Sequence, residues 1–169
     1  NNITLTNING VPMTNSIGTD FWSASGFISI NDAETETITW NTVMTDLAGN
    51  ENTISGSSDF KIDLTLPDIS GNVDISSNNT LFDTNTGISG SIVTASFKAD
   101  ETLSGATITI KANNVPLTNI SGVPMTNSIG TNIWSLSDKI IDADIDGAVT
   151  WDIKLTDLAG NVNTSGGSI

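Results

Sequence analysis

Val149-Thr-Trp-Asp-Ile-Lys-Leu-Thr156 alternates apolar and polar side chains along its whole length. Side chains two residues apart in a strand lie on the same face, so this pattern predicts a half-buried β-strand. The side chains expected on its buried face are Val149, Trp151, Ile153 and Leu155. An earlier stretch, residues 38–45, has a related pattern and places on one face Ile38, Trp40, Thr42 and Met44.

Further strands are predicted between these two stretches. Residues 92–99 alternate with Val93, Ala95, Phe97 and Ala99 pointing inward, and residues 106–111 form another candidate strand. Pairs such as Asn-Gly, Ser-Gly and Asp-Gly separate the candidate strands and are typical of turns. Many short strands at regular spacing predict an all-β sandwich, and no long helical period interrupts them.

The alternating stretches belong to a repeat. Residues 10–19 return unchanged at 122–131, which is a shift of 122 − 10 = 112. The hexapeptide Thr-Asp-Leu-Ala-Gly-Asn occurs at 45–50 and again at 156–161. Short-period solenoids repeat at roughly 20 to 50 residues. The longer period therefore predicts tandem domains of one kind.

The domain boundary is expected within residues 60–70. A strand leads up to Leu66, and Pro67 lacks the N–H group that a central strand requires. We therefore predict two domains, residues 1–66 and residues 67–169, the second close to the size of an immunoglobulin-like sandwich.

The two predicted domains are not equally complete. Residues 1–58 align with about 113–169, so the first copy lacks a counterpart of residues 67–112, here called the front half. The second copy stops before its own equivalent of residues 59–66. Two explanations are open: the chain is a piece of a longer array, or neighbouring chains complete each other by strand exchange.

Composition limits the function classes. The chain carries 19 acidic residues against five basic ones, a formal net charge of −14, and contains neither His nor Cys. A basic patch dominates affinity for nucleic acid and anionic membranes, so we expect neither as a partner. Catalytic constellations built on His or Cys are absent, and no run of about 18 apolar residues predicts membrane insertion. We expect no enzymatic activity.

One acidic stretch has the spacing of a calcium loop. Asp142-Ala-Asp144-Ile-Asp146-Gly147 places carboxylates at alternate positions and then a Gly for the bend. The twelfth position is Ile153, where an EF-hand needs Glu. The alternative is a solvated acidic hairpin, which we also consider for the Asp32-Ala-Glu34-Thr-Glu36 stretch of the first copy.

The repeated Asp-Leu-Ala-Gly-Asn segments at 46–50 and 157–161 are predicted turns, because Asp can accept hydrogen bonds from nearby backbone N–H groups and Gly tolerates positive φ. If such a turn lies where two domains meet, its carboxylate can share a cation with other acidic residues. Calcium is the candidate cofactor, because its ligands are oxygens. The candidate ligands for this interdomain site are Asp46, Asp157, Asp63, Asp68, Asp100 and Glu101. The alternative is a tight turn without a metal.

The four Trp residues are candidates for the core or for ligand binding. Trp40 and Trp151 lie on inward strand faces and are predicted core residues. Trp22 and Trp134 are also expected in the core, with stacking on a sugar ring as the alternative.

Three segments carry a family resemblance. They are Phe60-Lys-Ile-Asp-Leu-Thr-Leu-Pro67, the repeated Thr-Asp-Leu-Ala-Gly-Asn and Lys98-Ala-Asp-Glu-Thr-Leu-Ser-Gly105. The chain resembles the bacterial Ig-like repeats of large secreted adhesins and surface proteins of prokaryotes; similar modules occur in archaeal surface layers. The resemblance implies tandem immunoglobulin-like sandwiches, an extracellular or cell-surface location, and a spacer role in which calcium often stiffens the array.

The function that we expect is structural: a module of a stalk, fibre or surface layer that extends a distal function away from the cell. Its expected partners are neighbouring Ig-like repeats of the same or identical chains, with surface glycans as further candidates. Two alternatives stay open. One is a filament subunit that assembles by strand exchange, and the other is a carbohydrate-binding adhesin module that uses Trp22 or Trp134.

Overall fold

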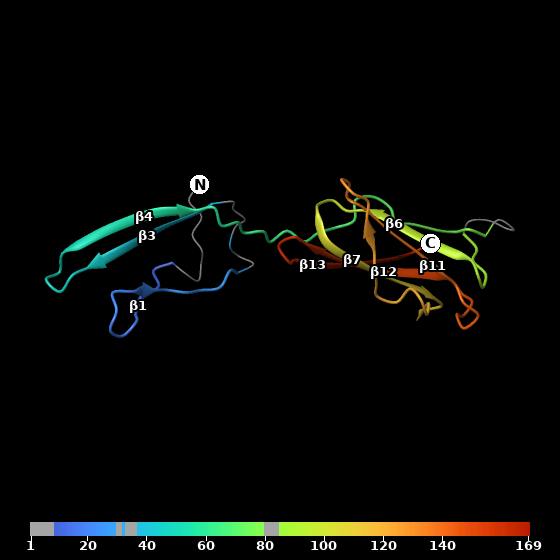
Figure 1. Cartoon of the computed structure of the whole chain (residues 1–169), viewed down its shortest axis with the longest axis horizontal. Coiled ribbons are helices and arrows are strands. Elements are labelled where there is room, and N and C mark those ends of the chain that lie inside the picture. The colour runs from blue at the N-terminus through green and yellow to red at the C-terminus, as the bar shows by residue number, and fades with distance from the viewer. Residues whose placement is uncertain (1–8, 30–31, 33–36, 80–84) are drawn as a thin grey trace. The chain divides into compact units, whose positions relative to one another are not determined.

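The computed structural model describes residues 9–29, 32, 37–79 and 85–169, and strands are the regular elements of these residues. The protein is therefore all-β, as the alternating stretches predict. The chain divides into two compact units, Asn1–Leu64 and Thr65–Ile169. This division falls two residues before the Leu66–Pro67 boundary that the sequence suggests. Figure 1 labels strands of both units.

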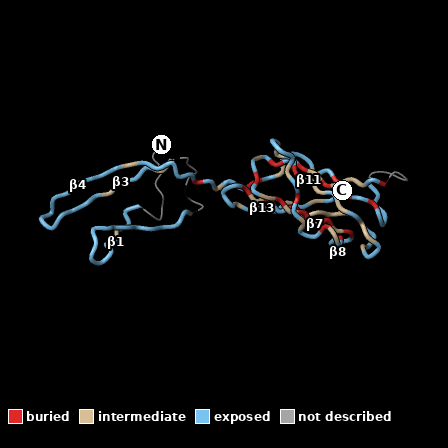
Figure 2. Tube along the Cα trace, in the orientation of Figure 1, coloured by how far each residue is buried: buried red, intermediate tan, exposed pale blue. Residues whose placement is uncertain are grey.

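The described residues of the N-terminal unit form two antiparallel pairs of strands. One pair is short and the other is long: β1 (Thr14–Asn15) with β2 (Trp22–Ser23), and β3 (Ile38–Thr45) with β4 (Glu51–Ser58). Most of the described residues of this unit are exposed (Figure 2).

The C-terminal unit contains two larger sheets. The four-stranded sheet has the order β10-β11-β6-β5; the other has the order β13-β12-β7-β8, with β9 also paired to β7. The strands are β5 (Asp74–Ser77), β6 (Ile92–Lys98), β7 (Leu103–Ala112), β8 (Val115–Pro116), β9 (Val123–Pro124), β10 (Thr126–Asn127), β11 (Ile133–Lys139), β12 (Val149–Asp157) and β13 (Val162–Ser168).

The core of the C-terminal unit lies between these two sheets. Every second residue is buried from Val93 to Phe97 in β6 and from Ala106 to Ala112 in β7, which confirms the inward faces expected for residues 92–99 and 106–111. One cluster joins apolar side chains of both sheets: Ile75, Val93, Ala95, Phe97 and Trp134 from the first, and Ala106, Ile108, Ile110, Ile153 and Leu155 from the second. Two sheets with a shared apolar interior are consistent with a β-sandwich.

Among the described residues, the segments of the sequence repeat have corresponding strand pairing. The β1–β2 hairpin pairs Asn15 with Trp22, and the β10–β11 hairpin pairs Asn127 with Trp134. The β3–β4 hairpin has the same kind of counterpart in β12–β13, since both are antiparallel and both are closed by the Asp-Leu-Ala-Gly-Asn segment. Strand pairing therefore corresponds in the two back halves, residues 1–58 and 113–169.

A Trp and a Gly face each other across both long hairpins. Trp40 is opposite Gly56, and Trp151 is opposite Gly167. A Cβ atom built on Gly56 would lie 2.4 Å from Trp40 Cζ2, and one on Gly167 would lie 2.7 Å from Trp151 Cζ2. The indole ring therefore lies across the glycine in each hairpin and occupies the space of the missing side chain.

The two copies differ in burial. Trp40 is 48% exposed, so the prediction that it is a core residue is wrong. Trp151 is half-buried and packs against the core, as expected. The physical reason is that β12 pairs with β7, whereas β3 pairs with no described strand except β4.

Candidate functional site

The turn at 157–161 holds a buried carboxylate at the end of β12. The backbone N–H of Asp157 donates to the carbonyl of Asn161 (3.1 Å), which closes the turn. Asp157 Oδ1 accepts from the backbone N–H groups of Gly160 (2.6 Å) and Asn161 (2.8 Å), and its Oδ2 accepts from Asn161 Nδ2 (2.8 Å). Gly160 has a φ of 97°, a left-handed conformation that favours glycine.

The turn at 46–50 repeats this arrangement at an exposed position. Asp46 Oδ1 accepts from the N–H groups of Ala48 (2.9 Å) and Asn50 (2.8 Å), and its Oδ2 accepts from Asn50 Nδ2 (2.8 Å). Gly49 has a φ of 88°. The five-residue segment thus forms the same turn in both units, and the predicted turn chemistry is confirmed.

Hydrogen bonds lower the pKa of both turn carboxylates. Burial raises the pKa of Asp157, but the bonds from Asn161 and Gly160 outweigh it, so that this pKa lies below its ordinary value. The Asn50 side-chain and backbone bonds lower the pKa of Asp46. Bonds that donate to an ionised carboxylate favour the charged form. Both turns therefore hold a negative charge at neutral pH.

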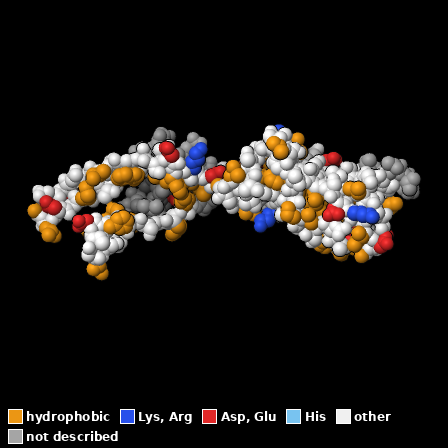
Figure 3. Space-filling model, viewed as in Figure 1, with side chains coloured by type: hydrophobic (Ala, Val, Ile, Leu, Met, Phe, Trp, Pro, Cys, Tyr) orange, Lys and Arg blue, Asp and Glu red, His pale blue; other side chains and the backbone are white. Residues whose placement is uncertain are grey.

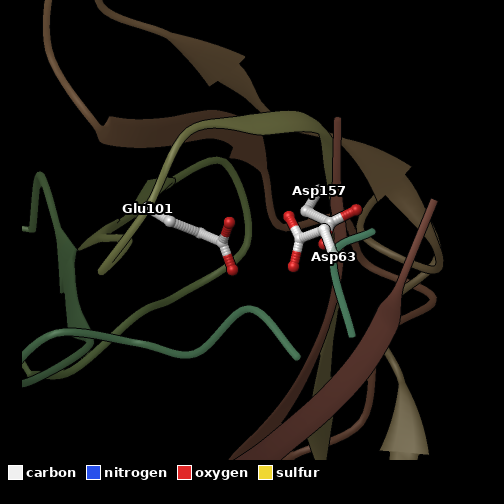
Figure 4. A group of neighbouring side chains, drawn as sticks. All are labelled: Asp63, Glu101 and Asp157. Atoms are coloured by element: carbon white, nitrogen blue, oxygen red, sulfur yellow. The ribbon is translucent and has the colours of Figure 1, made fainter. Parts of the chain in front are cut away.

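Glu101 and Asp157 form an acidic pair within the C-terminal unit. An oxygen of one carboxylate lies within 4.8 Å of an oxygen of the other, and Figure 4 shows both side chains. Glu101 precedes β7, and Asp157 ends β12 opposite Leu103 of β7. Antiparallel pairing of β7 with β12 thus brings together two residues that are far apart in the sequence. The third labelled carboxylate, Asp63, is an exposed residue of the N-terminal unit.

Asp68 and Asp100 bind each other's backbone at the start of the C-terminal unit. The N–H of Asp68 donates to Asp100 Oδ1 (2.8 Å), and the N–H of Asp100 donates to the carbonyl of Asp68 (3.0 Å). Asp100 is the sequence neighbour of Glu101. The candidate ligands Asp68, Asp100, Glu101 and Asp157 belong to the C-terminal unit, while Asp46 and Asp63 belong to the N-terminal unit.

The acidic stretch 142–147 is used largely for internal hydrogen bonds. Asp144 Oδ1 accepts from both the backbone N–H and the hydroxyl of Thr118, each at 2.8 Å. Its Oδ2 accepts from the N–H of Ile141 (3.0 Å). Burial raises the pKa of Asp144, but these bonds outweigh it and the pKa is lowered. Asp142 accepts from the hydroxyl of Ser89, and Asp146 is exposed.

The Asp144 turn also has a copy in the N-terminal unit. The N–H of Asp144 donates to the carbonyl of Ile141, and the N–H of Asp32 donates to the carbonyl of Ser29. Asp32 Oδ2 accepts from the N–H of Ser29 (2.7 Å), as Asp144 Oδ2 does from Ile141. The other acids considered in this stretch, Glu34 and Glu36, lie outside the described residues.

The two candidate sugar-binding Trp residues have different environments. Trp134 is only 6% exposed, which contradicts its use as an exposed stacking platform, whereas Trp22 is 56% exposed. Trp134 pairs with Phe97 of β6, and this neighbouring strand explains its burial.

Sequence analysis missed the partners that hold the acidic residues. No local signal marks Thr118, Ser89 or the half-buried ion pair between Lys111 and Asp152, because each partner is far away in the sequence. The folded C-terminal unit brings them together.

Comparison of the chain with protein-family models, with curated proteins and with solved structures finds no match. Among the described residues, no helix is long and apolar enough to span a membrane.

Proposed function

We propose that this chain is a non-catalytic structural module of an extracellular prokaryotic surface protein. It is built from tandem immunoglobulin-like repeats and forms part of a stalk, fibre or surface layer. There it holds a distal part of the surface protein away from the cell. The observation that carries the proposal is the repeated pair of hairpins, with corresponding strand pairing in both units. A protein that copies one β module in series gains length, and its neighbouring repeats are its first partners.

The surface chemistry supports this proposal. The net charge of −14 favours solubility, and sequence features of nucleotide, nucleic-acid or His-dependent catalytic sites are lacking. The resemblance to bacterial Ig-like repeats agrees with this location and role.

Calcium binding is the second part of the proposal. The pair Glu101 and Asp157 offers carboxylate oxygens from the segment before β7 and from the end of β12, and oxygen is the ligand type that calcium prefers. Asp157 already accepts three hydrogen bonds, and a carboxylate has about four acceptor positions. Calcium takes six to eight oxygens, so backbone carbonyls or water complete the set. The bound ion would offset the repulsion of these carboxylates.

Thermal unfolding with and without calcium tests this part. We expect millimolar calcium to raise the melting temperature of the full chain above its value in EDTA, because an ion that binds the folded state stabilises that state. Glu101→Gln should remove most of the shift, while the control Asp74→Asn, at an exposed position of β5, should keep it. An unchanged melting temperature in calcium contradicts the ion site. Loss of the shift in Asp144→Ala alone would assign the ion to the 142–147 loop instead.

Solution behaviour tests the spacer role. A spacer should sediment as one elongated species whose sedimentation coefficient does not depend on concentration. Concentration-dependent fibres would favour the filament alternative, for which the exposed apolar residues of the N-terminal unit are the supporting observation. Saturable quenching of Trp fluorescence by oligosaccharides, abolished in Trp22→Ala, would favour the carbohydrate-binding alternative.

A further inference from the structure

The C-terminal unit contains a cleft at the edge of its two sheets, where the segment 68–73 leads into β5 and where β13 ends its sheet. The volume of the cleft is about 400 Å³. Its lining includes Asp68, Ile69, Asn72, Trp151, Ser165 and Ser168. This volume lies toward the lower end of the range of ligand pockets, so the cleft suits a small molecule.

Hydrogen bonds hold both walls of the cleft in place. The segment 68–73 is tied to the four-stranded sheet, because the N–H of Ser70 donates to the carbonyl of Lys98 (2.7 Å). The opposite wall is β13, whose Asn163 Nδ2 donates to the carbonyl of Pro67 (2.9 Å). The cleft is therefore formed by the folded unit itself, and a ligand does not have to order its walls in order to bind.

The lining combines one aromatic ring with hydrogen-bonding groups. The indole of Trp151 is half-buried at the cleft. Asn72 and Ser165 can donate and accept hydrogen bonds, and the carboxylate of Asp68 can accept them. The N–H of Ile69 (2.8 Å) takes one of the roughly four acceptor positions of this carboxylate. The lining therefore suits a ligand that has both an apolar face and hydroxyl groups.

A neutral sugar has this combination, because its C–H groups form an apolar face and its hydroxyl groups surround the ring. The described lining contains no Lys, so an anionic ligand would find no opposite charge there. A cationic ligand could meet Asp68 and the indole, but the aromatic cages that bind such ligands use several rings, and the lining has one. Figure 3 shows mostly uncharged side chains and backbone on the visible face of this unit, with charged side chains scattered among them.

The polar lining is not a product of the sequence repeat. Trp151 corresponds to Trp40, and each is opposite a Gly of the next strand. Ser165, however, corresponds to Ile54, since 165 − 54 = 111 is also the shift of the repeated hexapeptide. The first copy thus has an apolar side chain where the cleft has a hydroxyl group. Trp40 is therefore an internal control for any ligand that binds at Trp151.

We propose that this cleft binds one or two rings of a neutral carbohydrate. The indole of Trp151 packs against the apolar face of a sugar ring, and Asp68, Asn72 and Ser165 form hydrogen bonds with its hydroxyl groups. The site goes beyond the proposed function, because a spacer needs no ligand, and it differs from the carbohydrate-binding alternative at Trp22. Sedimentation tests the spacer role and sugar titration tests this site, so either can fail while the other holds.

The test is a nuclear magnetic resonance titration of the full chain, isotopically labelled at its indole nitrogens. The probes are cellobiose and maltose, two neutral glucose disaccharides of different linkage. We expect at least one of them to shift the indole N–H signal of Trp151 saturably, with a millimolar Kd, because a shallow site with few hydrogen bonds binds weakly. The Trp40 signal should stay in place. Trp151→Phe identifies the Trp151 signal.

Three variants link the shift to the cleft. Asn72→Ala, at an exposed position, removes one hydrogen-bonding group and should raise the Kd about threefold to tenfold. Ser165→Ile installs the residue of the first copy and should abolish binding. Ser70→Ala is the control, because Ser70 is exposed and does not line the cleft, and it should leave the Kd unchanged. The indole signal of the buried Trp134 reports folding, and if Ser165→Ile loses it, Asn72→Ala decides.

Four outcomes would overturn the proposal. The first is that neither sugar shifts the Trp151 signal saturably, and the second is that Asn72→Ala leaves the Kd unchanged. A saturable shift of the Trp22 signal alone would assign sugar binding to the N-terminal unit instead. Choline chloride is the cationic competitor: a saturable Trp151 shift with choline and with neither sugar would identify a site for cations.

Discussion

The two units carry nearly the same back half, but only one of them buries it. Leu155 of β12 is 0% exposed, and the corresponding Met44 of β3 is 43% exposed. The hairpins and their closing turns are nevertheless alike in both units. Local sequence is therefore sufficient for hairpin pairing and turn hydrogen bonds, whereas burial depends on strands from elsewhere in the chain.

The largest expected difference between the units comes from deleting an apolar side chain at corresponding positions. Leu155→Ala should lower the free energy of unfolding of the C-terminal unit by about 2–5 kcal/mol, because a cavity forms in a packed core. Met44→Ala should change stability by less than about 1 kcal/mol, because its side chain already contacts solvent. Urea denaturation of the two variants measures both values. Equal losses would mean that the face of β3 is covered as well as that of β12.

The Trp–Gly pairs give a smaller effect. Gly167→Val should destabilise the C-terminal unit by about 1–3 kcal/mol, because the new side chain displaces the Trp151 ring that packs against the core. Gly56→Val should displace the Trp40 ring at a lower cost, since that ring is exposed. Near-ultraviolet circular dichroism and urea denaturation report ring position and stability. Thr164→Val, at an exposed position of β13, is the control and should leave both unchanged.

Acid should weaken the buried turn more than the exposed one. The pKa of Asp157 is lowered in the folded state, so its stabilising contribution is complete above the unfolded value of about 4. This contribution is lost as pH falls through the folded-state pKa. Asp157→Asn should cost on the order of 1–2 kcal/mol at pH 7 and should flatten the acid dependence of unfolding. Asp46→Asn should leave the unfolding of the C-terminal unit unchanged at every pH.

The smallest effect is expected at the Asp144–Thr118 contact. Thr118→Val removes the hydroxyl donor to Asp144 and keeps the backbone N–H donor, so we expect a loss of about 1 kcal/mol or less. A double-mutant cycle with Asp144→Ala measures the coupling of the two side chains. Additive effects would show that Asp144 stabilises only its own turn.

Much of the fold follows from short patterns in the sequence. Alternation in residues 92–99, 106–111 and 149–156 predicted three strands and their buried faces, which the structure confirms. The Asp-Leu-Ala-Gly-Asn segment predicted its own turn, because all the hydrogen bonds of that turn lie within five residues.

The environment of the candidate site was less predictable. Glu101 and Asp157 meet because β7 pairs with β12, and Asp144 likewise meets a residue that is distant in the sequence, Thr118. Trp40 shows the opposite failure: its strand pattern is that of a core residue, yet no described strand covers it. The pattern of a single strand indicates which of its faces can be buried. It does not identify the strands that would cover that face.

The order of these segments has a further consequence for how the chain folds. Residues 67–112 lie between two back halves that offer almost the same hairpins, so during refolding the front half can begin to pair with either one. The copies differ where the choice is made: Ile153 stands where the first copy has Thr42, and Leu155 where it has Met44. These larger apolar contacts favour the C-terminal partner. A few core side chains therefore decide which of the two stretches pairs with residues 67–112. Pairing with residues 1–58 instead would be a kinetic trap during refolding.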